Sequence, residues 1–439
     1  MQVSGRQLRE ILRENRSGSA GGVYSLCSAH PMVIHAGLTL ARDRGQMAVI
    51  EATCNQVNQD GGYTGMTPGD FAAQVRSAAA DVGLPQADLV LGGDHLGPQP
   101  WRNLTSGLAM AKAVSMVEAY ARAGFGKLHL DCSMPCADDP ETLDDAVVAQ
   151  RAAQLAAAAE VAAQDAAPPL YVIGTEVPAP GGMGAGHKVV PTAAARVHET
   201  WRAHERAFDR MDLNDAFSRV IAIVVQPGVD FGNEDVVQFS SPAAAALADT
   251  VLEVNGAVYE AHSTDYQNPE NYPALVAMHF AILKVGPAAT FALREAIYAL
   301  EEMAGELDEW DLSTGVRAEI ERAMTREPRH WTTHYVGDER QTAYLRHFSY
   351  SDRIRYYWTD PGVSRAVDRL FESLKDRPLP PPLVSQYLPQ HFRAVSSGAV
   401  PASATGLCLA NIQLALKPYA DACGVHPSSV YRSRAHGDG

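Results

Sequence analysis

The sequence predicts a (β/α)₈ barrel followed by a helical extension. Eight short apolar runs alternate with Ala-rich stretches over about the first 290 residues, which is the number and size that such a barrel needs. A doubly wound open sheet also alternates, but it usually has fewer strands, and the first turn here lacks the GxGxxG that opens its first helix. After about residue 305 the alternation stops.

The eight apolar runs have the composition of strands in a parallel sheet. Each is rich in Val, Ile and Leu and ends in polar residues. Near-continuous apolar sequence is typical of strands that are covered on both faces. The predicted strands lie within residues 22–28, 47–53, 88–94, 127–133, 170–176, 219–226, 257–263 and 280–286.

The stretches between these runs carry helix signals. The segment TPGD predicts a helix start with Thr67 as the N-cap. The same kind of start is predicted at Ser241 and Asn268, each of which precedes a proline. The alanine-dense segment 143–163 predicts a long helix. Glycines that end helices are expected at three positions, Gly83, Gly124 and Gly256.

The segment after the barrel has a different pattern. It is polar, rich in aromatic residues and helical in period, and a Pro-rich break interrupts it at 376–382. The sequence therefore predicts a (β/α)₈ barrel over residues 1–305 and a helical extension over 306–439. Because the extension exceeds what a barrel needs, we expect it to pack on the barrel or on a partner, either covering the site or contacting another subunit.

Composition excludes two broad classes of function. The 439 residues carry 36 Lys and Arg against 51 Asp and Glu, a formal net charge of −15, which argues against a nucleic-acid-binding surface. No apolar stretch is long enough to span a membrane, and the N-terminus lacks a signal-peptide core. The six cysteines form no CxxC pair, so we expect buried free thiols in a cytoplasmic protein.

Polar residues gather where the predicted strands end. A barrel of this type places its active site at the carboxyl ends of its strands. Burying so many polar groups there costs free energy unless each finds a partner, which is more than folding requires. The residues predicted to bind substrate at these ends are Glu51, Asn55, Asp131, Gln226 and Lys284.

Two strand ends, GGDHLGP and YEAHSTD, give the most specific indication of chemistry, because each combines a histidine with acidic residues. Imidazole and carboxylate groups on rigid strand ends suit a divalent metal such as Zn or Mn, with His95 and His262 as nitrogen ligands. Asp94 and Glu176 are each a candidate for a further ligand or for the catalytic acid or base. The alternative is that both histidines are hydrogen-bonded core residues. Three other histidines are predicted to be structural or to start a helix: His30, His129 and His279.

A glycine-rich loop and several basic residues are candidates for binding phosphate. The segment PAPGGMGAG at 178–186 contains Gly181 and Gly182, whose backbone amides could surround a phosphate, although a flexible loop has the same composition. Lys284, Arg353 and Arg355 could supply positive charge, or the two arginines could belong to a surface salt-bridge cluster. No P-loop or kinase signature is present, so no nucleotide cofactor is expected.

Longer motifs give the sequence a family resemblance. The chain resembles the Z-type subunit of class II D-tagatose-1,6-bisphosphate aldolase, the GatZ/KbaZ family, from about residue 5 to residue 392. Members of this family are often labelled tagatose-6-phosphate kinase. The motifs that carry the resemblance are HPMVIHAGL, IEATCNQVNQDGGYTGMTP, LGGDHLGP, LHLDCSMPCADDP, VIGTEVPAPGG, IVVQPGVDF, VYEAHSTDYQ, LKVGPAATFALREA and SDRIRYYW.

The resemblance implies an aldolase-type barrel that acts in galactitol, N-acetylgalactosamine or tagatose catabolism. The Z subunit is described as non-catalytic and as supporting a separate catalytic Y-type subunit, so an oligomer is expected. The Asp-His strand end is also similar to that of catalytic class II aldolases, which implies that Asp94 moves the proton, His95 binds metal and Glu176 is a further ligand. Those aldolases have more histidine ligands on later strands, and only His262 matches here, in a different motif.

Three functions are compatible with the sequence, and we predict the first of them, with the second as the alternative. The first is an aldolase-complex subunit that stabilises its partner. The second is a free-standing metal enzyme that cleaves or epimerises a ketose phosphate or bisphosphate. The third, ranked last, is a tagatose-6-phosphate kinase, as the family label suggests.

Overall fold

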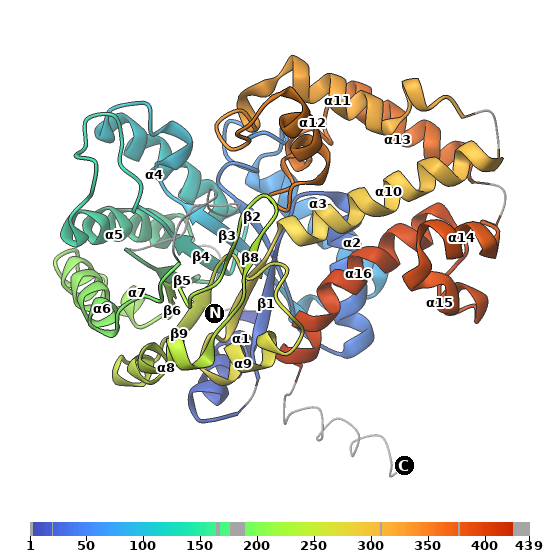
Figure 1. Ribbon diagram of the computed structural model, residues 1–439. Helices are drawn as coiled ribbons and strands as arrows, with labels where there is room; N and C mark the ends of the chain where they lie inside the picture. The colour runs from blue at the N-terminus through green and yellow to red at the C-terminus, as the bar shows by residue number, and fades with distance from the viewer. Residues whose placement is uncertain are drawn as a thin grey trace, which may run out of the picture.

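The computed structural model describes residues 3–19, 21–163, 167–175, 189–307, 310–375 and 378–424. Eight parallel strands close into a barrel, and they follow one another around it in chain order (Figure 1). This confirms the predicted (β/α)₈ barrel. The strands are β1 (Val23–Cys27), β2 (Ala48–Thr53), β3 (Leu89–Leu96), β4 (Lys127–Leu130), β5 (Leu170–Ile173), β6 (Val220–Val225), β9 (Val258–Ala261) and β10 (Ile282–Val285).

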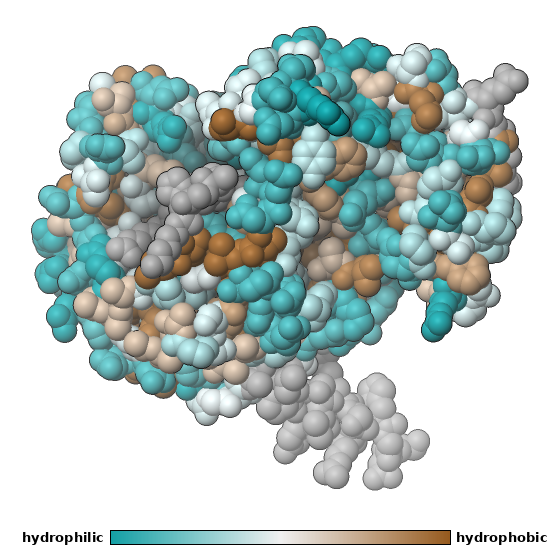
Figure 2. All heavy atoms as spheres, in the orientation of Figure 1, coloured by the Kyte–Doolittle hydropathy of each residue, from teal (hydrophilic) through white to brown (hydrophobic). Residues whose placement is uncertain are grey.

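Helices connect the strands and surround the barrel. After β6 the chain also forms a short antiparallel hairpin of β7 (Asp230–Phe231) and β8 (Val236–Val237). On the face of Figure 2 the surface is largely hydrophilic, and hydrophobic residues gather in a short band near the middle. The connecting helices are α2 (Pro31–Arg44), α3 (Pro68–Val82), α4 (Ser106–Arg122), α5 (Asp145–Ala162), α6 (Ala194–Asp209), α7 (Asn214–Phe217), α8 (Ser241–Thr250), α9 (Asn271–Ala277) and α10 (Pro287–Leu307).

Capping residues in the sequence determine where several of these helices begin and end. Thr67 caps α3 in a capping box with Asp70, and Gly83 ends the same helix in the left-handed region at φ 75°. Two predicted starts were displaced. The N-cap of α8 is Ser240, one residue before the predicted Ser241. The helix after Asn268 begins only at Asn271, because the Asn268 carbonyl first accepts the Asn271 amide in a turn.

The amino-terminal end of the barrel is closed by an apolar plug. Helix α1 (Val3–Arg16) buries Leu8, Ile11 and Leu12 in one cluster with inward residues of the strands, among them Val49 and Val258. Burial of apolar surface on this scale contributes stability and keeps water out of the barrel floor. The chemistry of the interior therefore changes from apolar at this end to polar at the carboxyl ends of the strands.

The chain after α10 is helical and packs beside the barrel. Helix α16 contacts α10, α2 and α9, and its Asn411 side chain donates to the Ala292 carbonyl at 2.8 Å. Figure 1 shows these helices gathered on one side of the barrel. No helix in the described ranges is long and apolar enough to cross a membrane. The helices are α11 (Val316–Arg326), α12 (Glu339–Phe348), α13 (Pro361–Ser373), α14 (Pro381–Tyr387), α15 (Phe392–Ser396) and α16 (Ala404–Cys423).

The six cysteines are free thiols, as the sequence predicts. Five are buried and Cys27 is partly buried. Burial raises the pKa of the Cys408 thiol above its ordinary value, so this side chain behaves as a small apolar group.

Candidate active site at the carboxyl ends of the strands

The end of β3 presents two consecutive side chains to one cluster. Successive side chains of a strand normally point to opposite faces, so only one of Asp94 and His95 should face the barrel interior. The register of β3 against β4 shifts between Gly93 and Leu96, and His95 lies in the left-handed region at φ 48°. This irregularity turns both side chains inward, and such strained residues in proteins gather at functional sites.

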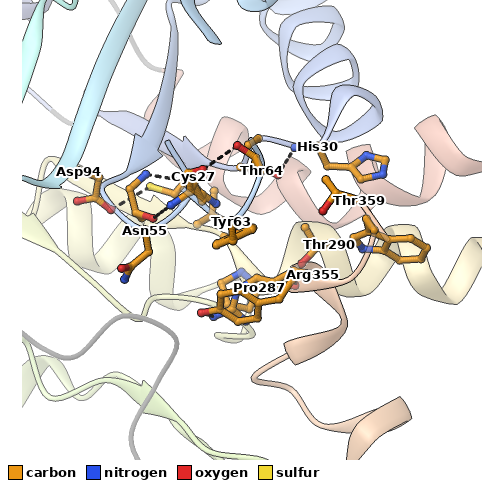
Figure 3. A pocket seen from close by; sticks show the side chains of 18 of the residues that line it. Cys27, His30, Asn55, Tyr63, Thr64, Asp94, Pro287, Thr290, Arg355 and Thr359 are labelled. Atoms are coloured by element: carbon orange, nitrogen blue, oxygen red, sulfur yellow. Dashed lines mark hydrogen bonds between the residues drawn. The ribbon is translucent and has the colours of Figure 1, made fainter. Parts of the chain in front are cut away.

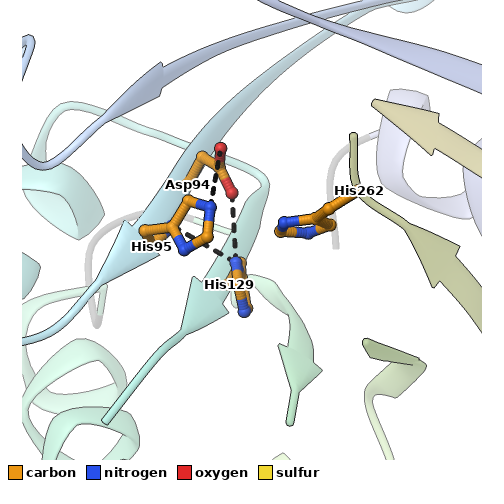
Figure 4. A group of neighbouring side chains, drawn as sticks. All are labelled: Asp94, His95, His129 and His262. Atoms are coloured by element: carbon orange, nitrogen blue, oxygen red, sulfur yellow. Dashed lines mark hydrogen bonds and ion pairs between the residues drawn. The ribbon is translucent and has the colours of Figure 1, made fainter. Parts of the chain in front are cut away.

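Three imidazoles meet Asp94 in this cluster. His95 comes from β3, His129 from β4 and His262 from the end of β9 (Figure 4). Their ring centroids lie 4.8 to 5.2 Å apart, and one possible ligand atom from each of the four residues lies within 4.8 Å of the others. All four side chains are buried. Nitrogen and carboxylate oxygen donors at this spacing suit a divalent transition metal.

Two of the three imidazoles have a carboxylate behind them. Asp131 lies 2.8 Å from His95 Nδ1, and Glu260 lies 3.0 Å from His262 Nε2. A metal-binding histidine usually donates its second ring N–H to such a group, which fixes the tautomer. Burial lowers the pKa of His262 to about 4, so its imidazole is neutral at pH 7 and has a lone pair to offer. His129 Nε2 is buried without a hydrogen-bond partner.

A layer of buried charges lies directly beneath the imidazoles. Lys127 on β4 lies 2.7 Å from Glu51 and 2.6 Å from Glu260. Lys284 on β10 contacts Glu51 and lies 2.8 Å from Asp94. Room for Glu51 comes from β3, where a Cβ on Gly92 would lie 2.6 Å from the Glu51 side chain.

These groups carry their charges in the folded protein. Burial raises the pKa of Glu51, but Lys127 and Lys284 outweigh it and hold that pKa below its usual range. Burial likewise opposes the charge on both lysines, yet their carboxylate neighbours keep both pKa values raised.

The cluster holds more carboxylates than ammonium groups. The acids are Glu51, Asp94, Asp131 and Glu260, and the lysines that stay protonated are Lys127 and Lys284. Burial lowers the pKa of His95, but Asp94 and Asp131 outweigh it and raise that pKa, so a proton on His95 offsets part of the excess negative charge when no metal ion is bound. With a metal ion on neutral imidazoles, four carboxylates against two ammonium groups leave two negative charges. Uncompensated buried charge is costly, so the donor set and the charge both fit a bound divalent ion.

Asp94 is held as a carboxylate at the edge of the cavity. Burial raises its pKa, but His95, Lys284 and the hydrogen bond from His129 hold that pKa well below its usual range. An ionised carboxylate on a rigid strand end can accept a proton from a substrate hydroxyl. Lys284 has the opposite property, because its raised pKa keeps it protonated and removes it as an amine nucleophile.

A cavity of about 620 Å³ opens above this cluster. The barrel contributes Cys27, His30, Asn55 and Tyr63 to its wall (Figure 3). The extension also reaches the cavity and lines it with Arg355, Tyr356, Trp358, Thr359, Ser364, Val367 and Asp368. The volume suits a small molecule, and the wall mixes aromatic with polar groups as ligand sites do.

The structure brings together most of the residues that the sequence predicts for the site. Two of them are not in the cluster and do not line the cavity: Gln226 accepts the Gly228 and Val229 amides of its own loop, and Arg353, which lies near the Tyr356 ring, donates to the His330 carbonyl. Glu176 and the glycine-rich loop with Gly181 and Gly182 lie outside the described residues. The predicted residues that meet at the cluster or line the cavity are Glu51, Asn55, Asp94, His95, Asp131, His262, Lys284 and Arg355.

Sequence reasoning missed three residues of the cluster. It assigned His129 a structural role and gave Lys127 and Glu260 no role in binding or catalysis. The alternation of the strands contains the missing signal, because Lys127, His129 and Asp131 are two residues apart and share the inward face of β4. The apolar neighbours of His129 are the outward residues Leu128 and Leu130.

Fold and site together define an eight-stranded parallel barrel with a buried imidazole and carboxylate centre at the carboxyl ends of its strands. The chain belongs to the family of D-tagatose-1,6-bisphosphate aldolase subunit GatZ/KbaZ-like proteins, which matches residues 8–424. A probable tagatose 6-phosphate kinase from Sinorhizobium meliloti 1021 is 47% identical, with a TM-score of 0.85, over 92% of this chain and 100% of that one. The predicted family is thus confirmed.

More distant structures show lower similarity. Fructuronate-tagaturonate epimerase UxaE from Cohnella laeviribosi is 13% identical, with a TM-score of 0.46, over 93% of this chain and 82% of that one. Fructose-bisphosphate aldolase from Campylobacter jejuni is 13% identical, with a TM-score of 0.43, over 85% of this chain and 94% of that one. The function of this chain is argued from its own residues.

The carboxylates behind the imidazoles give a first testable prediction. Asp131→Asn or Glu260→Gln removes the acceptor that orients His95 or His262, so we expect the dissociation constant for a divalent metal to rise about 10- to 100-fold. Equilibrium titration with Zn²⁺ or Mn²⁺ measures it. Asp139→Asn is the control, because Asp139 pairs with Arg151 away from the cluster. Equal affinities in all variants would contradict the assignment.

The start of α10 gives a second prediction. Asp265 accepts the backbone amides of Gly286 and Ala288 there, and burial raises its pKa to about 6. Because the folded protein binds this proton more tightly than the unfolded chain does, the protonated carboxyl group stabilises the fold, fully below about pH 4. This contribution is lost as the pH rises through 6 and the carboxyl group ionises. Asp265→Asn should therefore gain stability relative to wild type, by about 3 kcal/mol at most, between pH 4 and 7.

Urea denaturation at several pH values tests this prediction. Asp70→Asn is the control, because hydrogen bonds from Thr67 lower the pKa of Asp70, which is the opposite shift to that of Asp265. If the difference in free energy of unfolding between Asp265→Asn and wild type does not change with pH, ionisation of Asp265 does not destabilise this helix start, and the prediction is wrong.

Proposed function

We propose that this chain is itself a metal-dependent enzyme that acts on a ketose phosphate by aldolase-type chemistry. The observation that carries the proposal is the buried cluster of His95, His129, His262 and Asp94 beneath a cavity of about 620 Å³. A supporting subunit without catalysis has no need of a buried excess of carboxylates or of carboxylates that orient its imidazoles. These features cost stability, so they favour a working site.

The residues of the cluster have distinct proposed tasks. His95, His129 and His262 would hold a divalent ion, which when bound polarises the carbonyl and hydroxyl oxygens of a ketose. Asp94 accepts the proton of the hydroxyl on C4. The C3–C4 bond then breaks, its electron pair remains on C3 as an enediolate, and C4 becomes an aldehyde. Lys284 and Lys127 keep the carboxylates ionised and fixed throughout.

Cleavage and epimerisation share this first step. If the aldehyde leaves the cavity and the enediolate takes the proton at C3 to become a ketone, which returns Asp94 to its ionised form, the reaction is that of a lyase. If the aldehyde turns over and the enediolate adds to its other face, Asp94 returns the proton and the product is the C4 epimer. The wall that the extension adds to the cavity favours retention of the aldehyde, so we include epimerisation in the proposal.

A supporting role beside a catalytic Y-type subunit is the second candidate, and family membership favours it. Phosphoryl transfer is the third, because the S. meliloti relative is a probable tagatose 6-phosphate kinase. The sequence here has no P-loop or kinase signature, which argues against it.

One experiment separates these candidates. The purified chain is loaded with Zn²⁺ or Mn²⁺ and incubated with tagatose 1,6-bisphosphate, tagatose 6-phosphate and fructose 6-phosphate, with and without ATP, and products are followed by ¹³C NMR. We expect cleavage or C4 epimerisation by the chain alone, without ATP. Turnover only after a Y-type subunit is added would support the second candidate, and ATP-dependent phosphorylation would support the third.

A further inference from the structure

The extension presents a short basic turn to the cavity. The residues from Arg353 to Tyr356 form one 3₁₀ turn, which follows Asp352 in the left-handed region at φ 42°. Such a backbone is uncommon for a residue other than glycine and persists only where the surroundings fix it. Here Thr290 of α10 donates to the Asp352 carboxylate, and Arg294 of the same helix lies 3.8 Å from it.

A second contact fixes the residues just before this turn. Asn233, in the hairpin that follows β6, accepts hydrogen bonds from Ser349 and Ser351 through its side chain, at 2.9 and 3.2 Å. Its backbone carbonyl accepts the Tyr350 amide at 2.8 Å. Two elements of the barrel therefore hold the turn over the mouth, and its side chains have a defined place in the cavity wall.

Two guanidinium groups of this turn have no carboxylate partner in the described part of the chain. Arg355 Nη1 donates to the Ser351 carbonyl and to the Asp352 carbonyl, the latter at 3.1 Å, and its Nη2 donates to the Tyr356 hydroxyl at 3.2 Å. Arg353 donates to the His330 carbonyl at 3.1 Å, and its buried Nε has no hydrogen-bond partner. The Asp352 carboxylate lies 3.8 Å from Arg294 and accepts from Thr290, so it offsets the charge of Arg355 only in part and without a direct contact. Buried charge of this kind is usually paired or binds a ligand.

Arg355 faces the cavity far from the metal-binding end. It lines the cavity together with Tyr356 and Tyr63, whose rings lie 4.6 Å apart. Figure 3 shows Tyr63 between Arg355 and Asp94. Two other acidic residues line the cavity besides Asp94. Asp265 accepts hydrogen bonds from two backbone amides, and Asp368 lies at the exposed rim.

The two ends of the cavity thus carry opposite charge. The imidazole end has an excess of carboxylates over ammonium groups, and the outer end has the guanidinium groups of Arg355 and, behind it, Arg353. A ligand that matches both ends has oxygens for a divalent cation at one end and a dianion at the other. A guanidinium with free N–H groups suits a phosphate oxygen in charge and geometry.

We propose that Arg355, with Arg353 behind it, binds the phosphate group of the substrate, and that this anion site belongs to the extension. The proposal rests on the proposed ketose phosphate chemistry for the identity of the ligand, but the anion site itself does not require turnover. Lys284, the other cation of the described cavity wall, is occupied by Glu51 and Asp94 and is not the phosphate partner.

Phosphate binding and substrate preference test the proposal together. Inorganic phosphate is titrated into the metal-loaded chain by calorimetry, for wild type, Arg355→Gln, Arg355→Lys and Arg353→Gln. We expect Arg355→Gln to weaken phosphate binding about 10- to 100-fold, Arg355→Lys to restore part of it, and Arg353→Gln to have a smaller effect. Arg122→Gln is the control, because Arg122 lies exposed on α4.

The second readout compares kcat/KM for tagatose 6-phosphate with that for unphosphorylated tagatose. We expect this ratio to fall about 10- to 100-fold in Arg355→Gln, through KM for the phosphorylated sugar, while the value for tagatose stays within a factor of three. A structural defect would lower both values equally. If Arg355→Gln does not fold, Arg355→Lys and Arg353→Gln give the same comparison.

The outcomes separate this proposal from the function it builds on. Unchanged phosphate affinity and an unchanged ratio in the Arg355 variants would overturn the anion site, even if the chain is active. Phosphate affinity that falls in Arg355→Gln while no ketose phosphate is turned over would retain the anion site and refute the proposed chemistry.

Discussion

Replacing Asp94 with Asn is expected to lower kcat about 10²- to 10⁴-fold, the usual contribution of a positioned general base. The amide keeps the size of the side chain but has no basic oxygen for the proton of the substrate hydroxyl. Lys284 at 2.8 Å and His129 at 3.1 Å show that the carboxylate is held in one place. Product formation by ¹³C NMR measures the effect.

Two further measurements make this test specific. Asp368→Asn changes a carboxylate at the exposed rim of the same cavity, and we expect its kcat within a factor of three of wild type. Metal content is determined for both variants, since loss of the ion from Asp94→Asn would make Asp94 a ligand as well as the base. A kcat for Asp94→Asn within tenfold of wild type, with metal retained, would remove Asp94 from the mechanism.

Replacing Lys127 with Met is expected to lower the free energy of unfolding by about 3–5 kcal/mol. Lys127 is fully buried, and its ammonium lies between Glu51 and Glu260. Without it these carboxylates face each other with only Lys284 to neutralise them. The penalty comes from the unpaired buried charge that remains, rather than from the strength of the ion pairs themselves.

Urea denaturation of the metal-free chain measures this change. Lys112→Met is the matched control, because Lys112 pairs with Asp60 at the surface, where an ion pair contributes about 0–1 kcal/mol. The double variant Lys127→Met, Glu51→Gln should recover part of the loss, since it also removes one of the two unpaired carboxylates. A loss no larger than that of the control would show that the buried layer does not depend on Lys127.

The sequence predicts the barrel well because every strand is an apolar run covered on both faces. It also predicts His95 and His262, because each lies close to an acidic residue at a strand end, Asp94 in the first case. His129 was not among the predicted site residues for a physical reason. A run such as KLHLD has mostly apolar residues, and only the inward direction of every second residue shows that Lys127, His129 and Asp131 share one face.

Other features of the site depend on long-range contacts that no local pattern contains. Nothing near Asp352 in the sequence shows that Thr290 and Arg294 hold its turn, or that Asn233 fixes the residues before it. The contribution of the extension to the cavity wall arises from these contacts. The net charge of −15 likewise says little about the site, where negative and positive groups lie at opposite ends of one cavity.

Metal titration of the chain alone tests the central claim most directly. The chain is stripped with a chelator, and Zn²⁺ or Mn²⁺ is added back while bound metal and turnover of a ketose phosphate are measured together. We predict that activity is lost with the ion and returns in proportion to it, reaching its plateau at one ion per chain, and that His129→Ala shifts both curves to higher metal concentration. Turnover that is indifferent to the chelator, or a chain that binds no divalent ion, would contradict the account.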